Sequence, residues 1–196
     1  MDQKGTRFAI GGLPKGSYGY IRSKKIWVAV WTVLLFAVSL SLYLIGLKVT
    51  GSNQNILTIV AVLGCLPAGK SIVNLVMFLK AHGCTRELKE RIEPHAEGLD
   101  QLYDSVITAY EGAYEIPHLV YKAGNLVGIA VDQKCKVEEC EKHIHSMCVQ
   151  NTIKDVNIKI FRDEKKYLNR LDQLRDMEST DGKAEEVLAL IKAISL

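Results

Sequence analysis

The sequence has no charged residue between Ile26 and Leu47, a stretch of 22 residues. A helix rises about 1.5 Å per residue, so about 20 apolar residues cross the ~30 Å hydrocarbon core of a bilayer. A cleaved signal peptide has a shorter apolar core, roughly 7–15 residues, followed by a small-residue cleavage site. Here the stretch is followed by Lys48-Val49-Thr50-Gly51, which favours an uncleaved spanning helix.

The C-terminal part lacks an excess of positive charge. Residues 80–196 hold 17 Lys and Arg against 21 Asp and Glu, a net charge of −4. Binding to nucleic acid in general needs a basic surface, so we expect no nucleic-acid partner. The chain also has an odd number of cysteines, five, and four of them lie in this part, which we place in the cytoplasm. The sequence therefore predicts reduced thiols rather than disulfides.

Basic residues gather instead in the first 25 residues, which hold six Lys and Arg against one Asp, a net charge of +5. We interpret residues 1–25 as a basic, loop-like cytoplasmic leader. Its last basic residues and a neighbouring aromatic suit contact with lipid headgroups and an interfacial aromatic belt. These lipid-contacting candidates are Arg22, Lys24, Lys25 and Trp27.

A second apolar stretch follows, and we predict helices at about residues 26–47 and 56–79, forming a transmembrane hairpin over residues 26–80. The connection at residues 48–55 carries a single Lys. Because Lys and Arg near spanning helices are retained on the cytoplasmic side, we expect a multi-pass protein of the cell membrane with two spans and both termini cytoplasmic.

The second stretch is interrupted by polar and helix-bending residues. Pro67 removes a backbone donor and should kink the helix. Lys70, Ser71 and Asn74 give the helix a polar face within the membrane. This face either packs in a seam against hydroxyl groups of the first helix, such as those of Ser39 and Ser41, or lines an interface or water-filled path between subunits.

The same stretch matches the phosphate-loop pattern G-x-x-x-x-G-K-[ST] at Gly64-Cys65-Leu66-Pro67-Ala68-Gly69-Lys70-Ser71. In such a loop, backbone N–H groups hold phosphates, the Lys reaches them, and the hydroxyl binds Mg²⁺. Asp132, after an apolar strand, is the matching metal-binding acid. Nucleotide binding through Gly64, Gly69, Lys70, Ser71 and Asp132 is therefore the alternative function. The apolar flanks favour the membrane helix.

Residues 84–196 predict a small cytoplasmic α+β domain. A helical apolar face is predicted along residues 99–110 and a charged helical segment along residues 86–93. Residues 114–122 and 126–131 form a predicted hairpin around Ala123-Gly124-Asn125, and residues 156–160 a third strand. Further predicted helices are residues 136–150 and the apolar stripes at Leu168, Leu171, Leu174 and Met177 and at Val187, Leu188, Ile191 and Ile194. The fold class is thus α+β, a three-stranded sheet with flanking helices after a transmembrane hairpin.

Two further clusters have residue types that bind metals. Cys135, Cys140, His143 and Cys148 could bind zinc, although their spacing matches no zinc pattern and cysteines also pack in cores. Asp132 and Glu164-Lys165-Lys166 each follow a predicted strand, an arrangement that resembles the metal sites of restriction-type nucleases. Acidic residues are equally typical of a helix N-terminus. We therefore expect no metal and no cofactor.

The sequence indicates an integral membrane protein in which a helical hairpin anchors a cytoplasmic module for interaction or assembly. No catalytic Ser-His-Asp arrangement can be built from its histidines, and we expect no enzyme. The expected partners are membrane lipids and either a second copy, giving a homo-oligomer, or another membrane protein.

Overall fold

The structure, a computed structural model, describes residues 13–52, 55–110, 112–177 and 182–196. The chain forms two compact units. We call residues 22–80 the helical pair. We call residues 13–21 together with residues 81–196 the domain.

The helical pair contains α2 (Ile56–Lys80) and all of α1 (Tyr20–Thr50) except its first two residues, which belong to the domain. The predicted bounds of the second helix differ by one residue, but α1 begins six residues earlier than predicted. Arg22, Lys24 and Lys25 therefore lie in a helix and not in a loop-like leader. Residues 1–12 of the leader lie outside the described residues.

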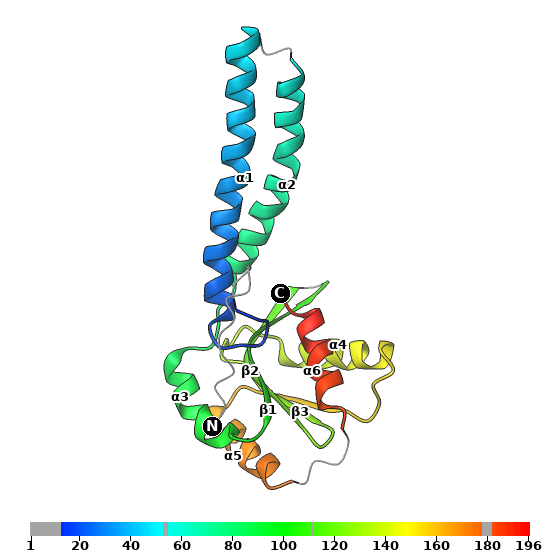
Figure 1. Cartoon of the computed structure of the whole chain (residues 1–196). Helices are drawn as coiled ribbons and strands as arrows, with labels where there is room; N and C mark the ends of the chain where they lie inside the picture. The colour runs from blue at the N-terminus through cyan, green and yellow to red at the C-terminus, as the bar shows by residue number, and fades with distance from the viewer. Residues whose placement is uncertain (1–12, 53–54, 111, 178–181) are drawn as a thin grey trace. The chain divides into compact units, whose positions relative to one another are not determined.

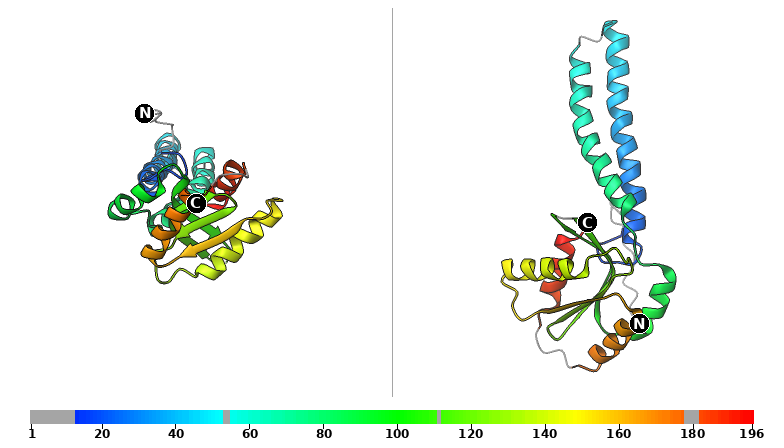
Figure 2. Two further views of the ribbon diagram at one scale, coloured as in Figure 1. Left: turned by 90° about the horizontal axis from the view of Figure 1, so that it is seen from below. Right: turned by 180° about the vertical axis from the view of Figure 1, so that it is seen from behind.

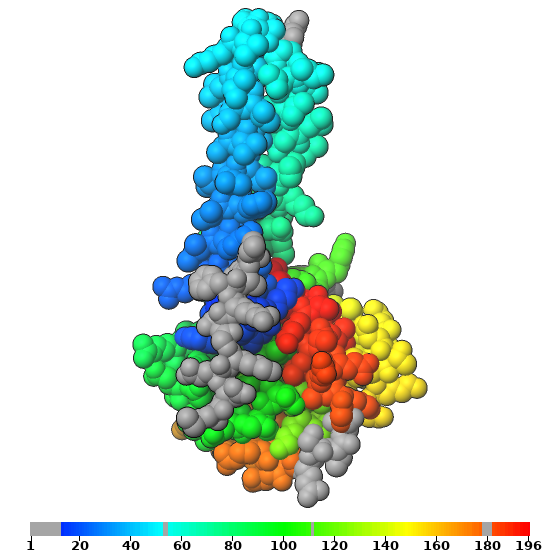
Figure 3. All heavy atoms as spheres, viewed as in Figure 1, coloured from blue at the N-terminus to red at the C-terminus, as the bar shows by residue number. Residues whose placement is uncertain are grey.

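Both helices are long and apolar enough to cross a membrane. Their side chains contact one another where Thr32 meets Ser71 and where Ser39 meets Gly64, and the two helices lie side by side in Figure 3. In Figures 1 and 2, α1 runs nearly straight whereas α2 bends along its course. Pro67 lies inside α2, and a proline there removes one backbone hydrogen bond and clashes with the preceding turn. The bend therefore has the cause expected from the sequence.

The sheet has four strands in the order β1 (Asp100–Ala109), β2 (Gly112–Lys122), β3 (Asn125–Ile129) and β4 (Asn157–Phe161). The first three are antiparallel neighbours, and β4 pairs parallel with β3. The predicted hairpin and last strand are present as β2, β3 and β4, with bounds that differ from the predicted ones by at most two residues. The prediction of three strands is wrong, because the segment taken for a helix at residues 99–110 is β1.

A change of face inside β1 explains this error. Leu102 packs on one side of the sheet and Tyr103 on the other. In a regular strand, Ile107, five positions after Leu102, would lie on the side opposite to it. Instead, Ile107 packs on the same side as Leu102. The switch occurs at Asp104, whose φ is 54°, opposite Pro117 of β2, which has no N–H to pair. The interruption breaks the period of two, so the apolar residues recur at helical spacing.

The remaining helices cover both faces of the sheet: α3 (Arg86–Ala96), α4 (Val137–Gln150), α5 (Glu164–Arg175) and α6 (Ala184–Ile194). Helices α4 and α6 pack on one face and α3 and α5 on the other (Figures 1 and 2). The predicted helices after residue 135 are confirmed, and α3 continues through Pro94 to Ala96.

A polar network crosses the core between the sheet and α5. His118 is fully buried; its Nδ1 lies 2.7 Å from the Tyr167 hydroxyl and its Nε2 lies 2.9 Å from Oε1 of Gln101. Burial lowers the pKa of His118 from 6.5 to about 3. The imidazole is therefore neutral at physiological pH, with one nitrogen donating and the other accepting.

Candidate functional site

A cleft of about 380 Å³ opens in the domain beside the carboxyl ends of β3 and β4. Because these two strands run parallel, the residues that follow them lie at one edge of the sheet, the edge at which parallel sheets commonly bind ligands. Asp132 follows β3, and Glu164 begins α5 just after β4. The other lining residues come from the segment before α3, from α3, from β2 and from the segment just after β3: His82, Gly83, Thr85, Leu88, Arg91, Glu115, Pro117 and Val131.

Local capping fixes the helices that frame the cleft. The Thr85 hydroxyl accepts from the backbone N–H of Leu88 at 3.3 Å and begins α3. The Asp163 carboxylate accepts from the N–H of Lys166 at 3.2 Å and begins α5. Such N-caps satisfy backbone donors that no helical bond can reach. The helices that supply Arg91 and Glu164 to the cleft are therefore fixed at their first turns.

The charges in the cleft are partly paired. Nη2 of Arg91 donates to Oε2 of Glu164 at 3.1 Å. The backbone N–H of His82 donates to Oε1 of Glu115 at 3.1 Å, and its Nδ1 lies 3.3 Å from the same oxygen. Asp132 accepts from the N–H of Lys134 at 2.9 Å. Three carboxylates thus face one guanidinium and one histidine, so the cleft favours positively charged groups.

The cleft also presents apolar surface. Val131 is 59% exposed, and Leu88 and Pro117 line the same space. Cys84 follows two of the lining residues, His82 and Gly83, in the chain, and it is buried. Its burial raises the pKa of its thiol to about 11, and the negative charge of Asp104 adds to this rise. The positive charge of Lys89 has the opposite, smaller effect. A protonated, buried thiol is a poor nucleophile.

A buried carboxylate next to this cleft joins two distant segments of the domain. Oδ1 of Asp104 accepts from the backbone N–H of Cys84 at 2.6 Å, and Oδ2 accepts from that of Ile21 at 3.4 Å. The N–H groups of Gly19 and Tyr20 also interact with it. Burial raises the pKa of Asp104 above 3.8, while these four N–H groups oppose the rise.

Asp104 thereby caps α1 from another part of the fold. The first turn of α1 has no acidic residue and contains Arg22, with Lys24 and Lys25 just after it, and the positive end of the helix dipole disfavours basic side chains. A carboxylate from β1 compensates both the orphan N–H groups and the charge. Sequence reasoning missed Asp104, because nothing in its neighbourhood signals contact with residues more than 80 positions away.

The structure separates the three residues of the predicted membrane polar face. The Ser71 hydroxyl is buried against α1, 2.6 Å from the Thr32 hydroxyl. Lys70 and Asn74 are exposed on another side of α2. Ser39 packs against Gly64, while Ser41 is exposed and donates to the Ala37 carbonyl at 2.7 Å. The seam thus contains Ser71 but not Lys70.

The phosphate-loop match does not form a loop. Gly64, Gly69, Lys70 and Ser71 all lie within α2, which is helical from Ile56 to Lys80. In a phosphate loop the backbone N–H groups point at the ligand, whereas within a helix they are bonded to the preceding turn. Asp132 belongs to the domain, whereas these four residues belong to the helical pair.

Among the lipid-contacting candidates, the Trp27 and Trp31 rings stack one helical turn apart, with centroids 5.6 Å apart. Arg22 and Trp27 are exposed, and Lys24 and Lys25 are half-buried. Stacked, exposed tryptophans beside basic residues are typical of a membrane interface.

The zinc candidates are placed mainly in the core. Cys135, Cys140 and Cys148 are buried, and burial raises the pKa of each thiol. Nε2 of His143 is buried and makes no hydrogen bond to the described residues. No group of three or more His, Cys, Asp or Glu in the described ranges is arranged to hold a metal ion.

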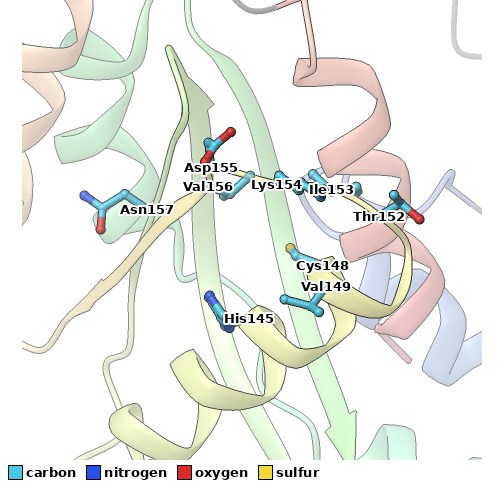
Figure 4. Close-up of a pocket in the computed structure, with 9 residues that line it drawn as sticks. All are labelled: His145, Cys148, Val149, Thr152, Ile153, Lys154, Asp155, Val156 and Asn157. Carbon is cyan, nitrogen blue, oxygen red and sulfur yellow. The ribbon is translucent and has the colours of Figure 1, made fainter.

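A second hollow, of about 650 Å³, lies between the end of α4 and the loop that leads to β4. Figure 4 shows His145 and Val149 on the helix below this loop, while Thr152, Asp155 and Asn157 point to different sides. Because its polar groups do not converge, this hollow is a weaker candidate than the cleft.

No protein-family model, no curated protein and no solved structure matches the chain. The functional interpretation therefore depends on the geometry of the chain itself.

Proposed function

We propose that the chain is an integral membrane protein in which a two-span hairpin anchors a non-enzymatic binding domain. The observation that carries this proposal is the sorting of side chains in the helical pair. Small and hydroxyl side chains lie between the helices: Thr32, Ser39, Ala61, Ala68 and Ser71. Large apolar side chains face outward, for example Val33 at 69% and Leu66 at 71% exposure.

This sorting suits hydrocarbon better than water. Within a bilayer, packing of small residues and hydrogen bonds between hydroxyls draw helices together, while large apolar residues face lipid. A core helix of a soluble protein buries its large apolar face. In an apolar 18-residue stretch of each helix, by contrast, only 11% of α1 and 17% of α2 is buried.

The connection to the domain supports an even number of spans. Residues 13–21, which lead into α1, and residues 81–85, which follow α2, belong to the same folded unit and share the Asp104 carboxylate. This shared contact supports a topology in which both ends of the hairpin lie on one side of the membrane. The positive charge of residues 1–25 supports a cytoplasmic location for that side.

The domain supplies the binding function through the cleft at the ends of β3 and β4. Its excess of carboxylates, together with the exposed side chain of Val131, fits a basic segment of a partner protein with an apolar residue nearby. Cys84, the thiol next to the cleft in the chain, is buried and has a raised pKa, which makes it a poor nucleophile and supports binding over covalent catalysis.

Membrane insertion is tested by carbonate extraction and by cysteine labelling of the full chain. The natural domain cysteines are buried, so we add one cysteine at Thr50 or at Val149, both exposed. In sealed cells, an impermeant maleimide should label Thr50→Cys from outside and Val149→Cys only after lysis. Extraction of the chain by carbonate, or equal labelling of both variants, contradicts the proposal.

The cleft is tested with a short Lys- and Arg-containing peptide carrying one leucine, and with a matched peptide in which Glu replaces the basic residues. The basic peptide should bind the detergent-solubilised full chain, and Asp132→Lys should weaken it about tenfold. Lys142→Glu, on the exposed side of α4, is the control. Equal binding of the two peptides contradicts this use of the cleft.

A further inference from the structure

Lys70 lies on the outside of the helical pair, near the middle of an apolar helix. It is 10 positions from Lys80 and 14 positions from Ile56, distances of ~15 Å and ~21 Å along the axis. Its side chain is exposed, and Asn74, one turn further along, is exposed on the same side. The two residues form a polar patch, here called the Lys70 patch.

Hydrocarbon is a poor environment for this patch. A lysine side chain reaches the headgroups only from near a helix end, and a charge near the bilayer centre is costly and usually faces protein or water. Lys70 forms no hydrogen bond or ion pair with any residue in the part of the chain that the structure describes. The seam hydroxyls are engaged elsewhere, since Thr32 and Ser71 bond to each other.

A second copy does not supply the missing charge. Neither α1 nor α2 contains an Asp or a Glu. A symmetric contact centred on the patch would bring two copies of Lys70 together without an acid, and like charges in a low dielectric repel strongly. The complementary group must therefore come from a different chain.

We propose that the Lys70 patch docks a membrane-spanning helix of another protein that carries an Asp or Glu at the same depth. This inference rests on the proposed membrane function. Gly69, next to Lys70, has no atom within 4 Å of the position of an added Cβ. A small residue of this kind lets two helices approach closely, and Asn74 adds a second hydrogen-bonding group.

The test uses the full chain in phosphatidylcholine vesicles and a synthetic helix of about 20 leucine-rich residues. One version of the helix has Asp at its centre and the other has Leu. Energy transfer between labels measures their association. The Asp helix should bind about tenfold more tightly than the Leu helix. Lys70→Met should abolish this preference, Lys70→Arg should keep it, and Lys80→Met, at the end of α2, should leave it unchanged.

Three results overturn the inference: equal binding of the two helices, a preference that survives Lys70→Met, or self-association of the chain that depends on Lys70. Carbonate extraction of the same vesicles separates the two levels of the argument. If the chain is extracted, the membrane proposal itself fails. If the chain stays in the membrane without preferring the Asp helix, only the docking inference fails.

Discussion

The helical pair and the domain sort the same kinds of side chain in opposite ways. The domain buries its large apolar residues, such as Ile92, Leu119 and Leu126, and leaves most of its charges outside. The helical pair hides Thr32 and Ser39 and exposes valine, leucine and isoleucine. Since the hydrophobic effect drives large apolar groups inward only in water, this inversion is the sorting that the proposed membrane hairpin predicts for helices that face lipid.

Each region also contains a polar residue that departs from this sorting. Lys70 puts a charge on the apolar exterior of the helical pair, and Asp104 puts a carboxylate inside the domain. Asp104 is matched by backbone donors, whereas Lys70 has no partner among the described residues. The first exception is satisfied within the fold, and the second is left for another molecule.

The largest expected effect comes from placing a charge on the exposed surface of each region. Val38→Asp, near the centre of α1 and 54% exposed, should oppose membrane insertion by about 3 kcal/mol, measured as the fraction that resists carbonate extraction. Val149→Asp, at 62% exposure in the domain, should change stability by no more than about 0.5 kcal/mol. If Asp is tolerated equally well at both positions, the surfaces of the helical pair and of the domain do not face different solvents.

Removal of the Asp104 carboxylate is the next largest effect. Asp104→Ala leaves several backbone donors unpaired and should lower the free energy of unfolding of the domain by about 3 kcal/mol. Asp104→Asn keeps one acceptor and suits a positive φ, so it should lose less. Hydrogen exchange of the Ile21 and Cys84 amides reports the loss directly. Asp132→Ala, an exposed carboxylate, is the control, and an equal effect of both variants argues against the cap.

Acid should destabilise the domain through His118. Its pKa is lowered from 6.5 to about 3 in the fold, so below pH 6.5 the unfolded chain takes up a proton that the native state does not. Stability from this group is complete above that pH and falls by about 2 kcal/mol between pH 7 and pH 5. Urea unfolding of the chain in detergent measures the slope. His118→Gln should flatten this dependence of stability on pH. If the slope is unchanged, a group other than His118 causes the sensitivity to acid.

The smallest effect distinguishes the two sides of α2. An added Cβ at Gly64 lies 2.8 Å from the Ser39 Oγ, whereas one at Gly69 meets nothing within 4 Å. Gly64→Ala should weaken the contact between the helices by about 1 kcal/mol, and Gly69→Ala should be neutral or stabilising. Energy transfer between labels on the two helices, followed through an SDS titration, compares them. Rescue of Gly64→Ala by Ser39→Ala would confirm the contact.

The sequence was sufficient for features governed by local periodicity. The 22 uncharged residues from Ile26, the turn at Ala123-Gly124-Asn125 and the apolar stripes of α4, α5 and α6 each carry their own signal. The same reasoning failed for β1, because the positive φ of Asp104 and the missing N–H of Pro117 exchange the faces of the strand. Neither effect follows from the spacing of apolar residues.

The candidate sites show the same limit. The sequence singled out Asp132 and Glu164 as acids after strands, and the structure places both in the cleft. It could not supply Arg91 or Glu115, because the packing of α3 and β2 brings them there. Lys70 was recognised from its depth in an apolar stretch, but its separation from Ser71 depends on which side of α2 meets α1.

The Asp104 cap also orders events during synthesis. Asp104 comes 20 positions after Cys84 in the chain, so at ~5–20 residues per second the ribosome adds it ~1–4 s after that residue. The whole hairpin has been translated before the carboxylate that joins its two ends exists. The link between Ile21 and Cys84 must therefore wait for β1, so in the growing chain these two segments are joined only after both helices have been made.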